Sequence, residues 1–149
     1  MAMAVDVAQL RAQLTPLCEP HQIEIIILFG SAAKGLQQSE SDLDLAVFSE
    51  KPLDIMTVTT DVIRALHMNR VDVVDLRRAS PLLAMEIARN GRLVYERHAG
   101  HYAGFQSLAF RRYVDTAKLR RAQKEAIHRY LAGRGLGRLR SIPILSAAS

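Results

Sequence analysis

Residues 30–47 read GSAAKGLQQSESDLDLAV, and they place a glycine-serine pair ten residues before two closely spaced aspartates. The final part, DLDLAV, alternates carboxylate and apolar side chains with a period of two, which is the pattern of a β-strand. Asp42 and Asp44 therefore point to one face of the predicted strand. The apolar residues between and after them point to the other face and provide the burial that stabilises the strand.

The two aspartates predict a binding site for a divalent cation. Carboxylates on neighbouring positions of one face repel each other unless positive charge lies between them. Because the ligand atoms are all oxygens, Mg²⁺ or Mn²⁺ is favoured over zinc. An isolated Asp-x-Asp is more often only a polar strand edge, so the metal hypothesis depends on the features around it.

Apolar segments on both sides of this stretch predict two further strands. Residues 22–29 (QIEIIILF) are rich in β-branched side chains and end at a glycine, as a buried strand does. Residues 70–76 (RVDVVDL) contain Asp72 and Asp75, which lie three positions apart and so point to opposite faces. Only one of them can join the first pair, and alternation alone does not choose between them. Three carboxylates on neighbouring strands would hold two metal ions, which align an attacking oxygen and a leaving pyrophosphate.

The Gly-Ser pair lies where the first strand ends and a turn begins. Free backbone N–H groups at such a turn can bind a phosphate. Gly30 permits close approach of the backbone, Ser31 provides a hydroxyl donor, and Lys34 adds a positive charge near the same anion. These three residues are the candidates for nucleotide binding.

Four helices are predicted outside these strands. Apolar side chains at helical spacing and capping residues place them over residues 5–17, 54–66, 81–90 and 98–132. A short strand over residues 92–95 precedes the last helix. That helix has a stripe of aromatic residues and alanines and a mostly basic opposite face, and His98 and His101 near its start are interpreted as surface residues. Gly133 and the glycines after it predict a helix stop and a flexible tail over residues 133–149.

The composition is that of an ordinary globular protein, with 149 residues of which 49% are hydrophobic and 23% charged. No apolar run is long enough to cross a membrane and no signal pattern begins the chain, so a cytoplasmic location is expected. Residues 1–96 hold 9 basic and 13 acidic residues, whereas residues 97–149 hold 11 and 2. This asymmetry favours an acidic partner for the C-terminal part, but the absence of a nucleic-acid reading motif disfavours DNA or RNA.

The Gly-Ser pair, its spacing from Asp-x-Asp and the later RVDVVDL segment resemble the signature of the polymerase-beta-like nucleotidyltransferases. The short length makes the chain similar, within that superfamily, to the minimal nucleotidyltransferase (MNT or MntA-type) antitoxins that accompany HEPN ribonuclease toxins. The resemblance covers about residues 20–96. It implies an α/β (α+β) fold with a mixed sheet of four to five strands, helices on one side, an open face for the metals and a long C-terminal helix.

We further expect three parts: a nucleotidyltransferase domain over residues 1–97, a helical extension over 98–132 that packs on the domain or a partner, and the tail. The resemblance implies that Asp42 and Asp44 bind the Mg²⁺ that carries the triphosphate. It also implies that Asp72, which matches the family's third carboxylate better than Asp75 does, completes the site. The family commonly has arginine where this chain has Lys34. Bidentate binding of a phosphate is therefore lost there, although a point charge remains.

The resemblance implies a Mg²⁺-dependent protein adenylyltransferase, with two metal ions, that transfers AMP from ATP to a tyrosine of a HEPN toxin in a hetero-oligomeric complex. The added phosphate would place negative charge where RNA phosphates must bind. Two alternatives remain. The chain could neutralise its toxin by binding alone, or it could modify a small molecule such as an aminoglycoside, for which no drug-binding domain is evident.

Overall fold

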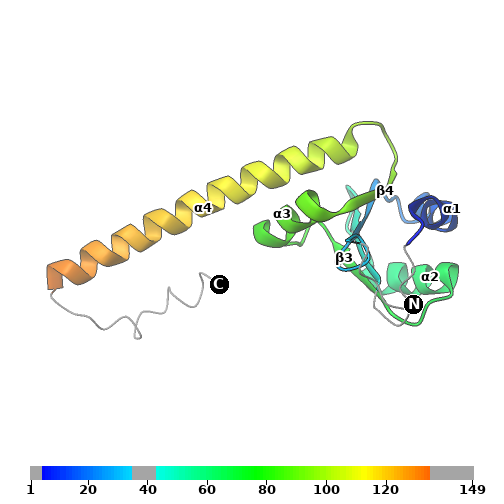
Figure 1. Cartoon of the computed structure of the whole chain (residues 1–149), viewed down its shortest axis with the longest axis horizontal. Helices are drawn as coiled ribbons and strands as arrows, with labels where there is room; N and C mark the ends of the chain where they lie inside the picture. Colours follow the sequence, from blue (N-terminus) through cyan, green and yellow to red (C-terminus); the bar gives the residue numbers. More distant parts are fainter. Residues whose placement is uncertain (1–4, 35–42, 135–149) are drawn as a thin grey trace. The chain divides into compact units, whose positions relative to one another are not determined.

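Eight helices and strands follow one another along residues 5–34 and 43–134, which are the residues that the computed structural model describes (Figure 1). In chain order they are α1 (Val7–Cys18), β1 (Ile25–Phe29), β2 (Leu43–Phe48), α2 (Ile55–Leu66), β3 (Val71–Asp75), α3 (Pro81–Asn90), β4 (Arg92–Glu96) and α4 (His101–Arg134). All eight correspond to elements predicted from the sequence.

Three helices begin at side-chain caps. The Asp6 carboxylate accepts hydrogen bonds from the first-turn N–H groups of α1, and Asp54 does the same for α2. Ser80 caps α3 by accepting from the Leu83 N–H, with Pro81 as the first helical residue. Each cap satisfies N–H groups that have no partner inside the helix, which fixes where these helices start.

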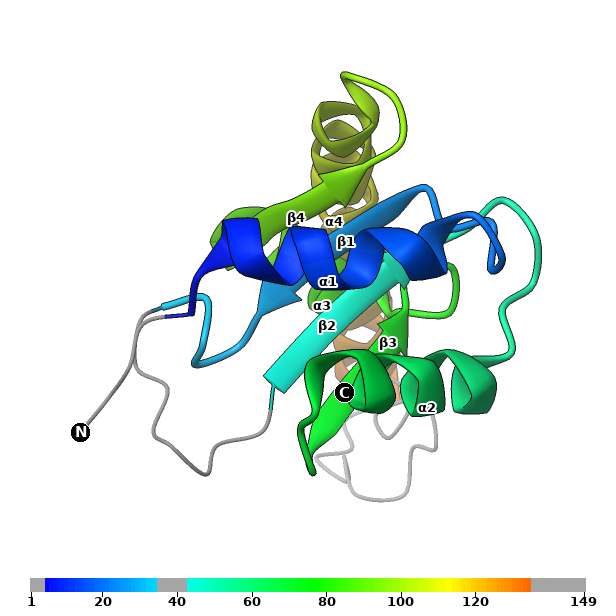
Figure 2. The same ribbon diagram turned by 90° about the vertical axis from the view of Figure 1, so that its right-hand side faces the viewer.

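The four strands form one mixed sheet in the order β3-β2-β1-β4 (Figure 2). β1 is antiparallel to both β2 and β4, and β2 is parallel to β3. The helix α2 makes the crossover between the two parallel strands, as a parallel connection requires. The predicted mixed sheet of four to five strands is confirmed.

One face of the sheet is covered by α1 and α2, which lie side by side across it (Figure 2). The alternating leucines and valine of β2 point to this face, as predicted from their period of two. The fully buried side chains that form this layer include Leu14, Ile26, Leu28, Leu43, Leu45, Val47, Val58 and Val94.

The second face is partly covered as well, so the expectation of helices on one side only is wrong. Ile87 of α3 and the first turns of α4 pack against Ile25, Ile27 and Ala46. The physical reason is the composition of β1, whose residues are apolar on both faces. A central strand of that kind needs a hydrophobic layer above and below it.

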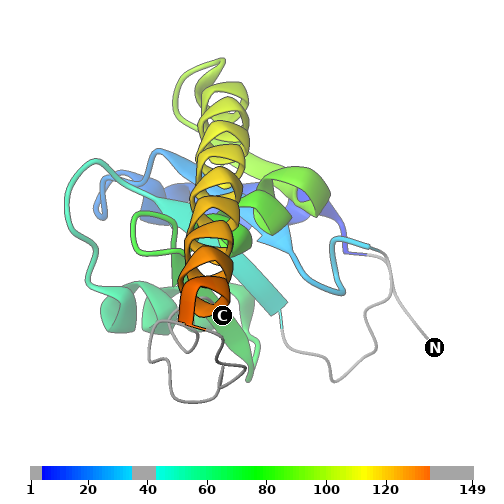
Figure 3. The same cartoon turned by 90° about the vertical axis from the view of Figure 1, so that its left-hand side faces the viewer.

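The chain divides into two compact units, Met1–Phe110 and Arg111–Ser149, and α4 runs through the boundary as one continuous helix (Figure 3). In the first unit, Phe105 and Ala109 of α4 are packed against hydrophobic neighbours. In the second unit, Leu119 and Tyr130 are 59% and 53% exposed.

One expectation about this helix is wrong. Successive residues of an α-helix are rotated by about 100° around its axis. Beyond residue 110, this rotation places basic residues on all sides of α4. The predicted apolar stripe and basic face are therefore not separated in this part of the helix. The described part of the helix ends at Arg134, one residue after Gly133. The remaining predicted tail lies outside the described residues. No helix in residues 5–34 or 43–134 combines the length and apolar character needed to span a membrane.

Candidate active site

Asp44 and Asp72 are direct neighbours across the two parallel strands. They are register partners in the pairing of β2 with β3, so their side chains project from the same face of the sheet. Asp44 is partly buried and Asp72 is exposed. On the other side of β2, the register partner of Asp44 is Phe29, the last residue of β1. The two carboxylates thus lie at the end of the sheet where β1 ends and β2 and β3 begin.

Asp75, the alternative third carboxylate, lies on the opposite face. Its register partner is Val47, and only 9% of its surface is exposed. The Arg77 backbone N–H donates to Asp75 Oδ1 at 3.0 Å, so this carboxylate stabilises the turn that follows β3. The strand register therefore brings Asp72, and not Asp75, to Asp44.

Gly30 brings the Gly-Ser turn into contact with this acidic pair. Its φ of +74° lies in the left-handed region, which disfavours residues with a side chain. A β-carbon built on Gly30 would collide with Oδ2 of Asp44. The two motifs that are ten residues apart in the sequence are thus in contact in space.

The rest of the turn leaves polar groups accessible. The Lys34 backbone N–H donates to the Ser31 carbonyl at 3.1 Å, and the buried Ala32 anchors the turn in the core. Ser31 is exposed beside Gly30. Lys34 Nζ lies 3.9 Å from Glu86 Oε1 on α3, and both side chains are about half exposed. Such an ion pair is weak, so an anion at the turn can compete with Glu86 for the lysine.

The remaining predicted metal ligand, Asp42, lies outside the described residues, as do residues 35–41. Within the described part of the chain, no three His, Cys, Asp or Glu side chains gather as metal ligands do. The donor set that is described nevertheless fits a hard cation: two carboxylates from adjacent strands, beside a glycine that leaves room above Asp44. Oxygen ligands of this type suit Mg²⁺ or Mn²⁺.

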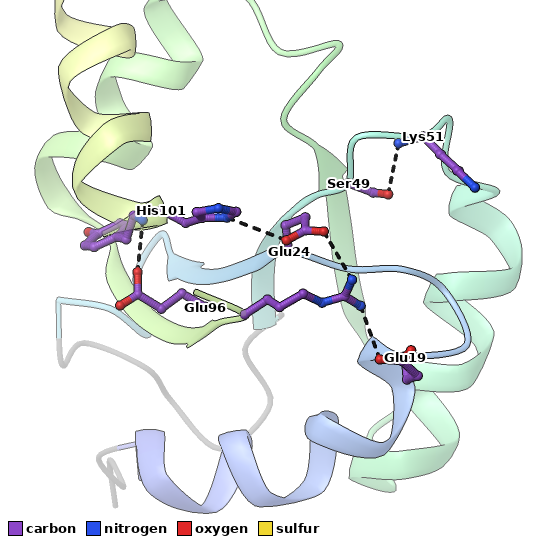
Figure 4. Close-up of polar contacts among 8 residues, drawn as sticks. Glu19, Glu24, Ser49, Lys51, Glu96 and His101 are labelled. Carbon is purple, nitrogen blue, oxygen red and sulfur yellow. Dashed lines mark hydrogen bonds and ion pairs between the residues drawn. The ribbon is translucent and has the colours of Figure 1, made fainter. Parts of the chain in front are cut away.

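A second polar cluster, which the sequence analysis missed, lies at the other end of β1 (Figure 4). Glu24 is 92% buried, and its Oε1 accepts a hydrogen bond from Arg97 Nη1 at 3.3 Å. His101 Nδ1 lies 3.6 Å from Glu24 Oε2, a buried oxygen that has no hydrogen-bond donor among the residues the structure describes. Arg97 also contacts the exposed Glu19. A hydrogen bond with Tyr95, and then the charges of Glu24 and Glu19, raise the pKa of Arg97. In the sequence, this cluster is indicated by the single carboxylate, Glu24, inside the apolar stretch QIEIIILF.

This cluster ties together the segments around the start of α4. The Glu96 carboxylate accepts from the Tyr102 N–H at 3.0 Å and so caps the first turn of α4, as Figure 4 shows. His101, interpreted from the sequence as a surface residue, has 34% of its side chain exposed and contacts the buried Glu24. The histidine therefore helps to hold the first turn of α4 within the first unit.

Comparison with known proteins identifies the origin of this arrangement. A family model described as "Polymerase beta, Nucleotidyltransferase" matches residues 12–99, which include all four strands. The protein adenylyltransferase MntA of Aphanizomenon flos-aquae (strain 2012/KM1/D3) is 25% identical over 138 residues, or 84% of this chain and 92% of the relative.

Solved structures show the same fold. A structure described as a toxin-antitoxin with AMP-PNP matches with a TM-score of 0.67 and 25% identity, over 79% of this chain and 98% of that one. A complex of the tri-AMPylated Shewanella oneidensis HEPN toxin with MNT antitoxin matches with a TM-score of 0.63 and 22% identity, over 83% and 99% of the two chains. These matches confirm the polymerase-beta-like fold that the sequence predicted.

Proposed function

The chain belongs to the polymerase beta nucleotidyltransferase family, and on that premise we propose that it is a Mg²⁺-dependent protein adenylyltransferase antitoxin. It transfers AMP from ATP to a tyrosine hydroxyl of a HEPN-type ribonuclease toxin in the cytoplasm. The observation that carries this proposal is the register pairing of Asp44 with Asp72 beside Gly30. The adenylyltransferase relative and the similar toxin-antitoxin structure with AMP-PNP support the choice of donor and partner.

Three carboxylates would hold the metal ions, namely Asp44 on β2, Asp72 on β3 and Asp42, which precedes β2 in the sequence. Bound Mg²⁺ would neutralise charge on the triphosphate and on the leaving pyrophosphate. The Gly30 and Ser31 turn binds the phosphates through its backbone N–H groups and the serine hydroxyl. Lys34 contributes a further positive charge on the same side.

In the transfer, the tyrosine oxygen forms a bond to the α-phosphorus of ATP, and the bond from that phosphorus to the bridging oxygen of pyrophosphate breaks. The hydroxyl proton must leave as the new bond forms. Asp72 is the exposed member of the acidic pair, so it is the carboxylate that an incoming acceptor reaches, and it accepts this proton. The product is an AMP-tyrosine on the toxin and free pyrophosphate.

The modification inactivates the toxin for an electrostatic reason. A ribonuclease binds RNA phosphates with cationic groups near its active site. A phosphodiester added to a tyrosine there introduces negative charge, which repels the RNA backbone and pairs with the same cations.

The test is to incubate the purified chain with Mg²⁺, ATP labelled at the α-phosphate and the HEPN protein encoded beside it. The proposal expects label on a toxin tyrosine and no label with the Asp44→Ala, Asp72→Ala double variant. Absence of label on the toxin with the wild-type chain would refute the proposal. Protection of cells from the toxin by the double variant would instead favour neutralisation by binding alone.

A further inference from the structure

A cavity of about 330 Å³ lies on the same face of the sheet as the acidic pair, at the other end of β1 and β2. Its floor includes Ile25 and Phe48, which are register partners across the two strands. Asp44 and Phe48 are four residues apart on β2, which corresponds to about 13 Å. One protein partner of ordinary footprint would cover both places.

Two glycines of the α4 region open this cavity. Gly100 and Gly104 both line it, and a β-carbon at either position would meet no atom within 4 Å. Gly104 is inside α4, where glycine destabilises a helix by about 1 kcal/mol relative to alanine. Since no close packing requires a glycine at position 104, its effect on the structure is to keep the space beside Phe105 and Leu108 empty.

The walls combine apolar and acidic character. Ile25, Phe48, Phe105 and Leu108 are apolar, and Leu108 is 40% exposed. Glu50 also lines the cavity, and within residues 5–34 and 43–134 its carboxylate makes no ion pair or hydrogen bond. Arg77 does contact Glu50, but it donates to the backbone carbonyl at 2.6 Å and not to the side chain.

The remaining polar wall residue is His101, and a carboxylate lies behind it. His101 Nδ1 is 3.6 Å from Glu24 Oε2, which is buried and receives no hydrogen bond from any described residue (Figure 4). Arg97 already compensates the charge of Glu24, so Glu50 is the carboxylate that the cavity offers, together with two aromatic side chains. A long side chain with an apolar stem and a cationic head is complementary to this combination, because aromatic faces and carboxylates both attract cations.

We propose that this cavity is a docking site for an arginine or lysine side chain of the ribonuclease partner, inserted next to the tyrosine that is modified. The inference rests on the proposed function, because a ribonuclease must present cationic side chains around its RNA-binding site. The basic side chain enters the cavity while the tyrosine reaches Asp72. The cavity therefore determines which protein is accepted as a substrate, and the chemical step remains with the acidic pair.

The test uses two substitutions in the full chain. Gly104→Leu fills the cavity, and Glu50→Gln removes its charge while keeping its shape. Gly133→Leu is the matched control, since a β-carbon at Gly133 also meets no atom within 4 Å and this glycine lies in the same helix outside the cavity. We expect Gly104→Leu to raise both the Kd and the KM for the toxin about tenfold, which is about 1.4 kcal/mol of binding energy.

The KM for ATP should stay unchanged in all three variants, and the melting temperature of Gly104→Leu should not fall, because leucine favours a helix over glycine. Glu50→Gln should weaken toxin binding less than Gly104→Leu but measurably, and less so at high salt. Gly133→Leu should bind the toxin as the wild type does.

The outcomes separate this inference from the proposed function. If the wild type modifies the toxin and Gly104→Leu binds it equally well, the docking site is refuted and the enzyme remains. If Gly104→Leu weakens binding but Glu50→Gln does not, the occupant is apolar and the basic side chain is refuted. If the wild type neither binds nor labels the toxin, the proposed function fails and the docking site fails with it.

Discussion

Gly30 lies directly against the carboxylate of Asp44, and no side chain fits between them. This contact couples the Gly-Ser turn to the strand that carries Asp44. It also explains why glycine is needed at this place, because the backbone has a positive φ where a β-carbon would collide with Asp44.

Gly30→Ala should therefore damage both stability and activity. The left-handed backbone alone costs an alanine about 1 to 2 kcal/mol, and the collision displaces Asp44. We expect a lower free energy of unfolding in urea and a loss of AMP transfer of at least about tenfold. Gly133→Ala, where the added methyl meets nothing, should leave both quantities close to wild type. Normal transfer by Gly30→Ala would show that the turn does not position the nucleotide.

Asp72→Ala and Asp75→Ala should have opposite effects, although the two aspartates are on the same strand. Asp72 is exposed, so its removal should change stability by less than about 0.5 kcal/mol but reduce transfer by at least about a hundredfold. Asp75 is buried and accepts from the Arg77 N–H, so its removal should cost about 1 kcal/mol. Transfer rates measured well below the melting temperature should remain near wild type for Asp75→Ala. The reverse pattern would assign the third carboxylate to Asp75.

Asp72 and Asp75 also show which part of the site can be predicted from the sequence. The period of two showed that Asp72 and Asp75 point to opposite faces, but a strand's own pattern does not reveal how it is aligned with its neighbour. That alignment comes from the pairing of Asp44 with Asp72, which depends on how α2 returns the chain to the sheet. Long-range register of this kind was accessible only through family resemblance.

Local signals predicted the elements well because each had a physical marker close in the sequence, such as the Ser80 cap of α3. Two features are not predicted by local signals. The apolar residues of β1 indicate burial but do not show which elements cover each face, so the sequence does not predict that α3 and α4 pack there. The Glu24 cluster joins residues more than 70 positions apart, and only the unusual carboxylate in an apolar strand indicated it.

Glu24→Ala and Glu19→Ala compare two carboxylates that contact the same arginine. Glu24 is buried and its side chain is 10% exposed, whereas the side chain of Glu19 is 92% exposed. Loss of Glu24 leaves Arg97 and His101 without their buried partner, and we expect a melting temperature lower by several degrees. Loss of Glu19 should leave the melting temperature nearly unchanged, because exposed ion pairs contribute little. Equal effects in thermal denaturation would contradict the structural role of the cluster.

Cys18 should make stability fall at alkaline pH. Burial raises the pKa of the Cys18 thiol from 9.0 to about 11, although the charge of Arg97 opposes the shift. The thiol of the unfolded chain ionises first, so this contribution is complete below pH 9 and is lost as the pH rises from about 9 to 11. In that window the wild type should lose about 1.4 kcal/mol per pH unit more than Cys18→Ala, measured by urea denaturation. Parallel pH profiles for the two proteins would refute this.

The alternating pattern of β2 determines what happens when this strand pairs with β3 in the wrong register. The same register that sets Asp44 beside Asp72 also turns Leu43, Leu45 and Val47 toward α1 and α2. A slip of one position between these strands would bring carboxylates into the hydrophobic layer and leucines into water. A misaligned molecule would therefore unfold rather than persist as an intact but inactive nucleotidyltransferase, so the abundance of folded protein should closely track the amount that is catalytically competent.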